Sequence, residues 1–126
     1  MLVEYLLQTD ASAAIRAVLR APDVDVRVPA LCDVEVTAAL RRGLLRGLFT
    51  PERAGLALQQ YLVMPLTRHA HRALLPRMLD LRSNFSAYDA CYVALAERLG
   101  ADLLTADEPL SRAVRTHTKI VLLGTA

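Results

Sequence analysis

Short apolar segments separated by longer helical patterns most limit the folds open to this chain. Val-Asp-Val-Arg-Val over 24–28 alternates with period two, which predicts a strand with one solvated face, ended by Pro29. The runs 103–105 and 120–123 are short and apolar and predict further strands. Helices alternating with such strands indicate an α/β layer fold with a mainly parallel sheet, in which functional groups gather at the carboxyl ends of the strands.

Capping residues and prolines place the helices. The Thr-Pro pair at 50–51 predicts an N-cap and a first helical residue, and Ser86 and Gly100 predict the two ends of a long helix. The segment 62–67 is predicted as an edge or bulged strand because it contains a proline, and Pro76 predicts a kinked helix. The predicted helices cover 11–20, 31–42, 51–61, 69–81, 86–99 and 107–114.

The composition indicates one compact domain over residues 1–126, because 54% of the side chains are hydrophobic. Cys32 and Cys91 each lie in an apolar segment, which is typical of free, buried thiols in a reducing compartment. No stretch approaches the roughly 20 apolar residues of a membrane span, and no basic leader precedes an apolar run. We therefore expect a soluble, cytoplasmic protein. The net charge of +2 is too small to identify a nucleic-acid partner.

Three acidic residues are predicted to converge. Glu35 lies on the small apolar face of its helix, whereas Asp33 lies roughly 160° away on the other side. Asp89 is aimed at the core by its own helix, and Asp107 directly follows the strand at 103–105. Three converging carboxylates without a histidine or thiol among them favour a hard cation, Mg²⁺ or Mn²⁺, as the neutralising partner.

Each acid also has a purely structural interpretation that spacing alone leaves open. Ser86 and Asp89 fit a capping box, in which the carboxylate reaches back to the serine amide. Asp107 fits the N-cap of the next helix, and Glu35 fits a first-turn acid favoured by the helix dipole.

Three segments, in this order and spacing, carry a resemblance to a known family. They are PALCDVEV at 29–36, SAYDACYVALA at 86–96 and LTAD at 104–107. These segments resemble the successive signatures of the VapC-type PIN domain, and the resemblance extends over essentially the whole chain.

The resemblance implies a fold, a site and a reaction. The fold is a three-layer α/β arrangement with a mainly parallel sheet of about five strands flanked by helices. Carried over by motif, Glu35, Asp89 and Asp107 are the catalytic acids and bind Mg²⁺ or Mn²⁺, and Thr105 or Ser86 assists from nearby. The implied reaction is metal-assisted hydrolysis of RNA phosphodiester bonds.

Basic and aromatic residues near these motifs suggest how RNA is held. Arg42, Arg46 and Arg112 bracket the site in sequence and are predicted to contact the RNA backbone, although they also fit solvated helix ends. Tyr88 and Tyr92 could stack on bases, but core packing or a dimer contact is the preferred interpretation.

The chain departs from the family at its beginning. The family starts with an apolar strand that ends in Asp-x-Ser, and the run 2–7 resembles the segment directly after that motif, so we expect the first strand and its aspartate to lie upstream of Met1. Asp-Ala-Ser at 10–12 matches the letters of the motif but leaves too little chain before Glu35, and Glu4 is a weaker substitute.

These features leave two candidate functions. The first is an Mg²⁺- or Mn²⁺-dependent endoribonuclease that acts as the toxin of a type II toxin–antitoxin system, for which the family implies a homodimer and a small cognate antitoxin. The alternative is a catalytically inactive PIN-like module that still binds an antitoxin or RNA, because one carboxylate of the family's set is missing.

Overall fold

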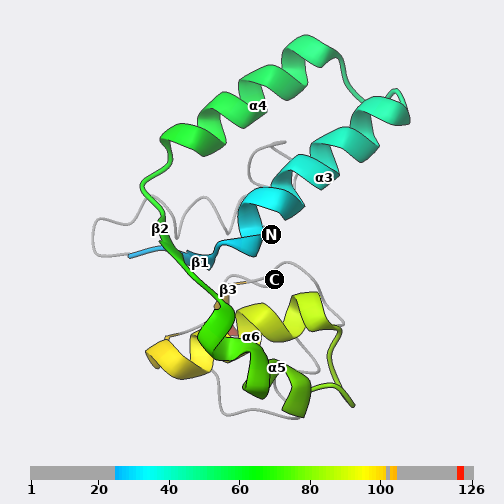
Figure 1. Ribbon diagram of the computed structural model, residues 1–126. Coiled ribbons are helices and arrows are strands. Elements are labelled where there is room, and N and C mark those ends of the chain that lie inside the picture. Colours follow the sequence, from blue (N-terminus) through cyan, green and yellow to red (C-terminus); the bar gives the residue numbers. More distant parts are fainter. Residues whose placement is uncertain (1–24, 102, 105–121, 124–126) are drawn as a thin grey trace.

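A computed structural model describes residues 25–101, 103–104 and 122–123 of the chain (Figure 1). The elements within these ranges, in chain order, are β1 (Arg27–Pro29), α3 (Leu31–Leu45), α4 (Pro51–Val63), β2 (Thr67–His69), the 3₁₀ turn η1 (Arg72–Leu74), α5 (Leu75–Asp80), α6 (Ala87–Leu99), β3 (Leu103–Leu104) and β4 (Leu122–Leu123). The helices predicted over 11–20 and 107–114 lie outside the described residues, as do the run 2–7 and the alternatives Glu4 and 10–12.

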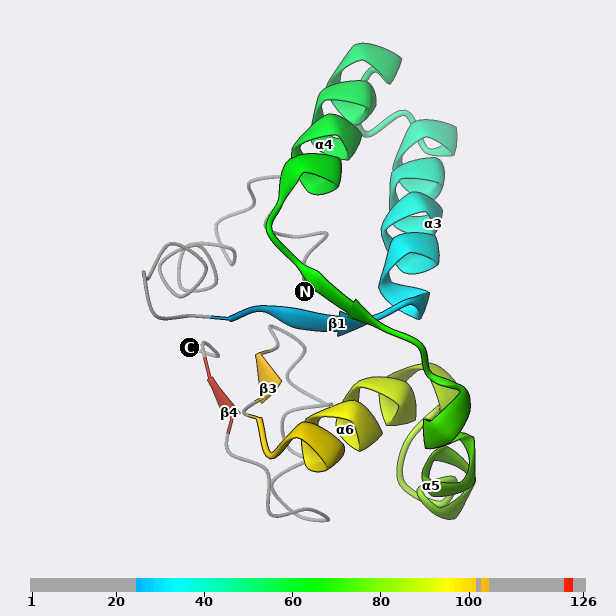
Figure 2. The ribbon, with the colours of Figure 1, turned by 60° about the vertical axis from the view of Figure 1, so that its left-hand side comes forward.

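The strands form two parallel pairs. In β1 and β2, Val28 lies opposite Arg68, and in β3 and β4, Leu103 lies opposite Leu122. The chain crosses from β1 to β2 through α3 and α4, which run side by side in opposite directions (Figure 1). Helix α6 runs beneath β1, contacts it, and leads into β3 (Figure 2). The predicted α/β class with parallel strands is confirmed, whereas a sheet of about five strands stays a prediction.

The end of β1 differs from the prediction that Pro29 stops the strand. Pro29 is itself the last residue of the strand, is buried, and pairs with His69. The next amide, Ala30 N–H, donates to the His69 carbonyl at 2.8 Å. Proline is tolerated here because the following residue supplies the hydrogen bond that closes the pairing.

The strand predicted over 62–67 is wrong. Helix α4 continues to Val63, and the strand that follows is β2, two residues beyond Pro65. Met64 has extended backbone angles, φ −66° and ψ 139°. A residue that precedes proline is disfavoured in the helical region, so Pro65 ends α4 from the outside instead of interrupting a strand.

The single kinked helix predicted over 69–81 is also wrong. His69 belongs to β2, a short turn η1 follows, and α5 begins only at Leu75. Pro76 therefore lies in the first turn of α5, where its missing N–H removes no hydrogen bond of the helix.

The predicted caps are confirmed. The Thr50 hydroxyl accepts from Arg53 N–H at 3.1 Å, and the Ser86 hydroxyl accepts from Asp89 N–H at 3.1 Å. Gly100 ends α6 with a φ of 61°, in the left-handed region that favours glycine. These contacts fix the start of α4 and both ends of α6.

The core has two main parts, which meet at Tyr92. The first lies between β1, α3 and α4, and contains Val28, Cys32, Val36, Leu40, Ala57 and Tyr61. The second lies between α6, β3 and the segment before α6, and contains Leu81, Phe85, Ala90, Val93, Ala96 and Leu103. Tyr92 of α6 packs against both. Its ring is therefore held by elements from both halves of the described chain.

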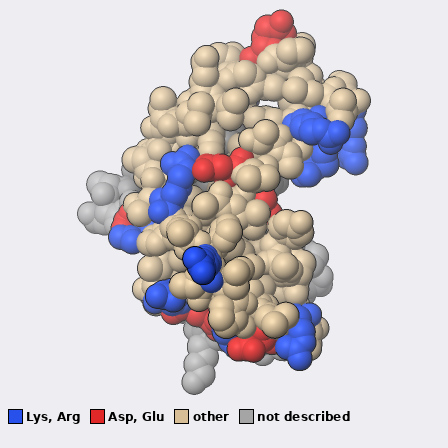
Figure 3. Space-filling view, in the orientation of Figure 1, with Lys and Arg blue, Asp and Glu red and all other residues tan. Residues whose placement is uncertain are grey.

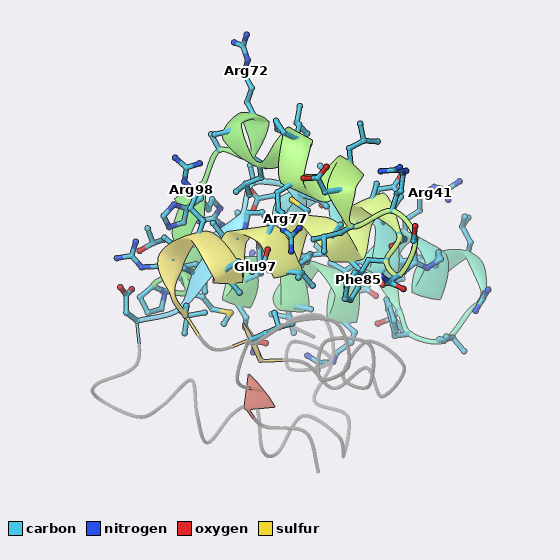
Figure 4. All side chains as sticks on the ribbon, turned by 90° about the horizontal axis from the view of Figure 1, so that it is seen from below. Arg41, Arg72, Arg77, Phe85, Glu97 and Arg98 are labelled. Carbon is cyan, nitrogen blue, oxygen red and sulfur yellow. The ribbon has the colours of Figure 1, made fainter. Side chains whose placement is uncertain are left out.

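Peripheral contacts complete the fold. Arg77 of α5 and Glu97 of α6 point toward one another (Figure 4) and form two hydrogen bonds of 2.8 and 3.0 Å. Cys32 and Cys91 are free and buried, as predicted, and burial raises the pKa of both thiols. No helix in the described part of the chain is long and apolar enough to cross a membrane.

Candidate active site

Helix α3 directs Glu35 toward α6. The Glu35 side chain is half-buried, and its Oε1 accepts a hydrogen bond of 2.6 Å from the Tyr92 hydroxyl. Burial, together with this bond to a carboxylate, raises the pKa of Tyr92 above its usual range, so the hydroxyl keeps its proton and acts as a donor. The inward orientation predicted for Glu35 is confirmed.

Asp33 points to different partners, as predicted. Its Oδ1 accepts from the Tyr61 hydroxyl at 2.5 Å, and the Nε of Arg68 lies 2.9 Å from Oδ1 and 3.1 Å from Oδ2. The Arg68 guanidinium also lies over the Tyr61 ring, 5.4 Å from its centroid. The Tyr61 hydrogen bond, and then Arg68, lower the pKa of Asp33. Asp33 is therefore an anchor between α3, α4 and β2.

The charge of Glu35 is not balanced by a neighbouring cation in the part of the chain that the structure describes. Among residues 25–101, no lysine, arginine or histidine forms an ion pair with it, and its Oε2 atom accepts no hydrogen bond. A half-buried carboxylate favours a compensating positive group. Oxygen donors of this kind match Mg²⁺ and Mn²⁺, so the residue fits the cation that the sequence predicts.

Asp89 lies on the side of α6 that also carries Tyr92. It stands in the first turn of that helix, half-buried, three residues before Tyr92. Side chains three residues apart lie on the same side of a helix, with Cβ atoms about 5–6 Å apart. Asp89 and Tyr92 therefore start from the same side of α6, and a contact between Asp89 and Glu35 stays a prediction. Ser86 caps the helix, and any further part that it plays in the site stays a prediction.

The remaining predicted site residues, Thr105, Asp107 and Arg112, lie outside the described residues. Strand β3 ends at Leu104, directly before Thr105. No group of three histidine, cysteine, aspartate or glutamate side chains suited to a metal occurs within the described ranges, which do not include the third predicted acid. The convergence of Glu35, Asp89 and Asp107 therefore stays a prediction.

Exposed arginines gather at the far end of α3. Arg41, Arg42 and Arg46 are exposed there, and Figure 3 shows the basic surface at the upper right. Arg42 and Arg46 follow Glu35 by two and three helical turns and share its side of the helix, roughly 10 and 16 Å along the axis. Contact of these arginines with RNA stays a prediction.

The two tyrosines of α6 have different surroundings. Tyr88 is 60% exposed, so core packing is wrong for this residue, and base stacking or a dimer contact stays a prediction. Tyr92 packs in the core as predicted, but its hydrogen bond to Glu35 was not foreseen. A usable signal was present, because a buried tyrosine hydroxyl normally requires an acceptor.

Replacing Asp33 by asparagine is expected to lower the free energy of unfolding by about 1 kcal/mol at neutral pH, because the Tyr61 hydroxyl and Arg68 lose a charged acceptor and the ion pair is largely solvated. Since folding lowers the pKa of Asp33, its contribution is complete above about pH 4 and is lost progressively as the pH falls through the lowered value. Urea denaturation of both proteins across this range measures the effect. A difference that stays constant in acid would contradict it.

Comparison with known proteins gives consistent matches. A family model described as PIN domain matches residues 1–115. Ribonuclease VapC12 of Mycobacterium tuberculosis is 35% identical over 122 residues, which cover 97% of this chain and 93% of that protein. VapC ribonuclease Mb0985 of Mycobacterium bovis is 38% identical over 113 residues, 84% of this chain and 89% of that protein. Ribonuclease VapC1 of M. tuberculosis is 36% identical over 125 residues, 96% and 91% of the two chains.

Proposed function

Because the chain belongs to the PIN-domain family, we propose that it is an Mg²⁺- or Mn²⁺-dependent endoribonuclease. The observation that carries the metal dependence is the half-buried Glu35 carboxylate, which has a neutral hydroxyl as its hydrogen-bond partner and no cation beside it among the described residues. The names of the relatives, each a ribonuclease, support RNA as the substrate.

The roles of this chain's residues are assigned from the family motifs and from the chemistry of the side chains. Glu35, Asp89 and Asp107 would hold a divalent ion through carboxylate oxygens, and the bound ion would supply Lewis-acid activation of water and charge stabilisation at the phosphate. Thr105 and Ser86 support the acids from nearby.

Binding of the RNA backbone is assigned to arginines. Arg42 and Arg46 extend from Glu35 along α3, and Arg112 follows Asp107 in the sequence. Contacts to phosphate oxygens fix the register of a nucleic acid without reading its bases. These arginines therefore orient the scissile bond over the carboxylates.

The wider setting is part of the same proposal. The protein acts as the toxin of a type II toxin–antitoxin pair in the cytoplasm, as one PIN-like domain over residues 1–126. It forms a homodimer and is held by a small cognate antitoxin. The free, buried cysteines support a reducing compartment, and the VapC relatives support the toxin assignment.

The proposal is tested by incubating the full chain with a circular RNA, which only an endonuclease can open. Cleavage is expected with Mg²⁺ or Mn²⁺, to stop in EDTA, and to return when Mg²⁺ is added in excess, because the ion activates the water. The variant Glu35→Gln, purified in parallel, controls for contaminating nucleases. Cleavage that persists in EDTA would contradict the metal, and RNA binding without cleavage would favour the inactive module.

A further inference from the structure

We propose that Tyr92 is a positioning residue for Glu35, because its hydroxyl fixes one carboxylate oxygen and leaves the other oriented for a divalent ion. This inference rests on the proposed function. The Tyr92 hydroxyl donates to Oε1 at 2.6 Å, and Oε2 accepts no hydrogen bond from the described residues. A hydrogen bond to one oxygen of a liganding carboxylate is a recurrent way of orienting a metal ligand.

The position of the Tyr92 hydroxyl is fixed from several sides. Tyr92 projects from α6, and its partly buried ring packs against both parts of the core. A tyrosine side chain has only two rotatable angles before the hydroxyl, and packing of the ring restricts both. The Glu35 carboxylate, on a more flexible side chain, therefore takes its orientation from Tyr92.

The second tyrosine–carboxylate pair on α3 shows what Tyr92 does differently. Asp33, two residues before Glu35, also accepts from a tyrosine hydroxyl, that of Tyr61. Arg68 then contacts both oxygens of Asp33 and neutralises it. The partner of Glu35 is a neutral donor, which orients the carboxylate and leaves its negative charge for a cation. The same helix thus carries one carboxylate used for the fold and one kept for a ligand.

The test is Mn²⁺ binding by the full chain in the absence of RNA, measured from the electron paramagnetic resonance signal of free Mn²⁺. Tyr92→Phe removes only the hydroxyl oxygen and is expected to weaken Mn²⁺ binding about tenfold, the range for losing a group that orients a metal ligand. Tyr61→Phe is the matched control, because it likewise removes a tyrosine hydroxyl, the one that donates a hydrogen bond to Asp33. It is expected to change Mn²⁺ affinity by less than about twofold, the scatter of independent sites.

A second measurement keeps Tyr92 in place. Binding of Mn²⁺ at Glu35 is expected to change the tyrosine absorbance of the unmodified protein, and Tyr61→Phe is expected to keep this signal. Loss of the signal in Tyr61→Phe would assign it to Tyr61 and overturn the inference, even if Tyr92→Phe failed to fold.

The outcomes separate the two proposals. Equal Mn²⁺ affinity in wild type and Tyr92→Phe would overturn the positioning role and leave the metal-dependent function standing. Failure of the wild-type chain to bind Mn²⁺ would overturn both. A tenfold loss in Tyr92→Phe, with Tyr61→Phe unchanged, would establish the role of Tyr92.

Discussion

Replacing Asp89 by asparagine is expected to abolish Mg²⁺-dependent RNA cleavage, with a loss of more than about 100-fold. Removing a group that only orients a metal ligand already reduces affinity or activity by about 10- to 100-fold, so removing a ligand should exceed that range. The fold in EDTA should be equally or more stable, because one of several mutually repelling charges is gone. Thermal melts in EDTA, beside the RNA cleavage assay, measure both quantities.

The same variant tests the structural interpretation of Asp89. If its carboxylate serves only to cap α6, cleavage per folded molecule survives and the free energy of unfolding falls by about 0.5 to 2 kcal/mol. Asp80→Asn provides a matched control, because it makes the same chemical change on an exposed side chain at the end of α5. Full cleavage by Asp89→Asn would remove this residue from the active site.

Truncating Tyr61 to alanine is expected to lower the free energy of unfolding by about 3 to 5 kcal/mol, the range for removing a buried aromatic side chain. Tyr61 is only 2% exposed and joins α4 to the core residues of β1 and α3. Its loss also removes the aromatic ring beneath the Arg68 guanidinium and the hydroxyl that donates a hydrogen bond to Asp33. Domains of this size have about 5 to 15 kcal/mol of stability in total, so the effect is a large fraction of it.

Chemical denaturation of Tyr61→Ala and Tyr61→Phe, measured in parallel, separates the contribution of the aromatic ring to the free energy of unfolding from that of the hydroxyl. The phenylalanine variant keeps the packing and is expected to lose only about 1 kcal/mol, the usual net value of one hydrogen bond. Similar losses in the two variants would show that the ring does not pack between α3 and α4 as described.

The helices were largely predictable, and the effects of proline were not. Thr50, Ser86 and Gly100 act through local backbone geometry, and the structure confirms all three. The sequence predicts Pro65 inside a strand and Pro76 inside a helix, but Pro65 follows the end of α4 and Pro76 lies in the first turn of α5. A proline can lie just beyond the end of a helix or strand, in the first turn of a helix, or inside an element that it distorts. The local sequence alone does not decide which of these applies.

Helical periodicity predicts the directions of two acidic side chains on α3. The different directions of Glu35 and Asp33 follow from 100° per residue, and the structure confirms them. The partners of these acids were not foreseen, since Tyr61, Arg68 and Tyr92 come from other elements. Which tyrosine hydroxyl donates to which carboxylate depends on how α3, α4 and α6 pack together. The residue pattern along a single helix does not predict this packing.

The hydrogen bond between Tyr92 and Glu35 has a consequence for the order in which this protein is made. The two residues are 57 positions apart in the chain. A ribosome adds about 5 to 20 residues per second, so roughly 3 to 11 s separate the synthesis of the carboxylate from that of the hydroxyl. Until α6 has emerged and docked beneath β1, Glu35 has no Tyr92 to orient it. The contact between this carboxylate and this hydroxyl therefore forms only after the chain has been made as far as α6.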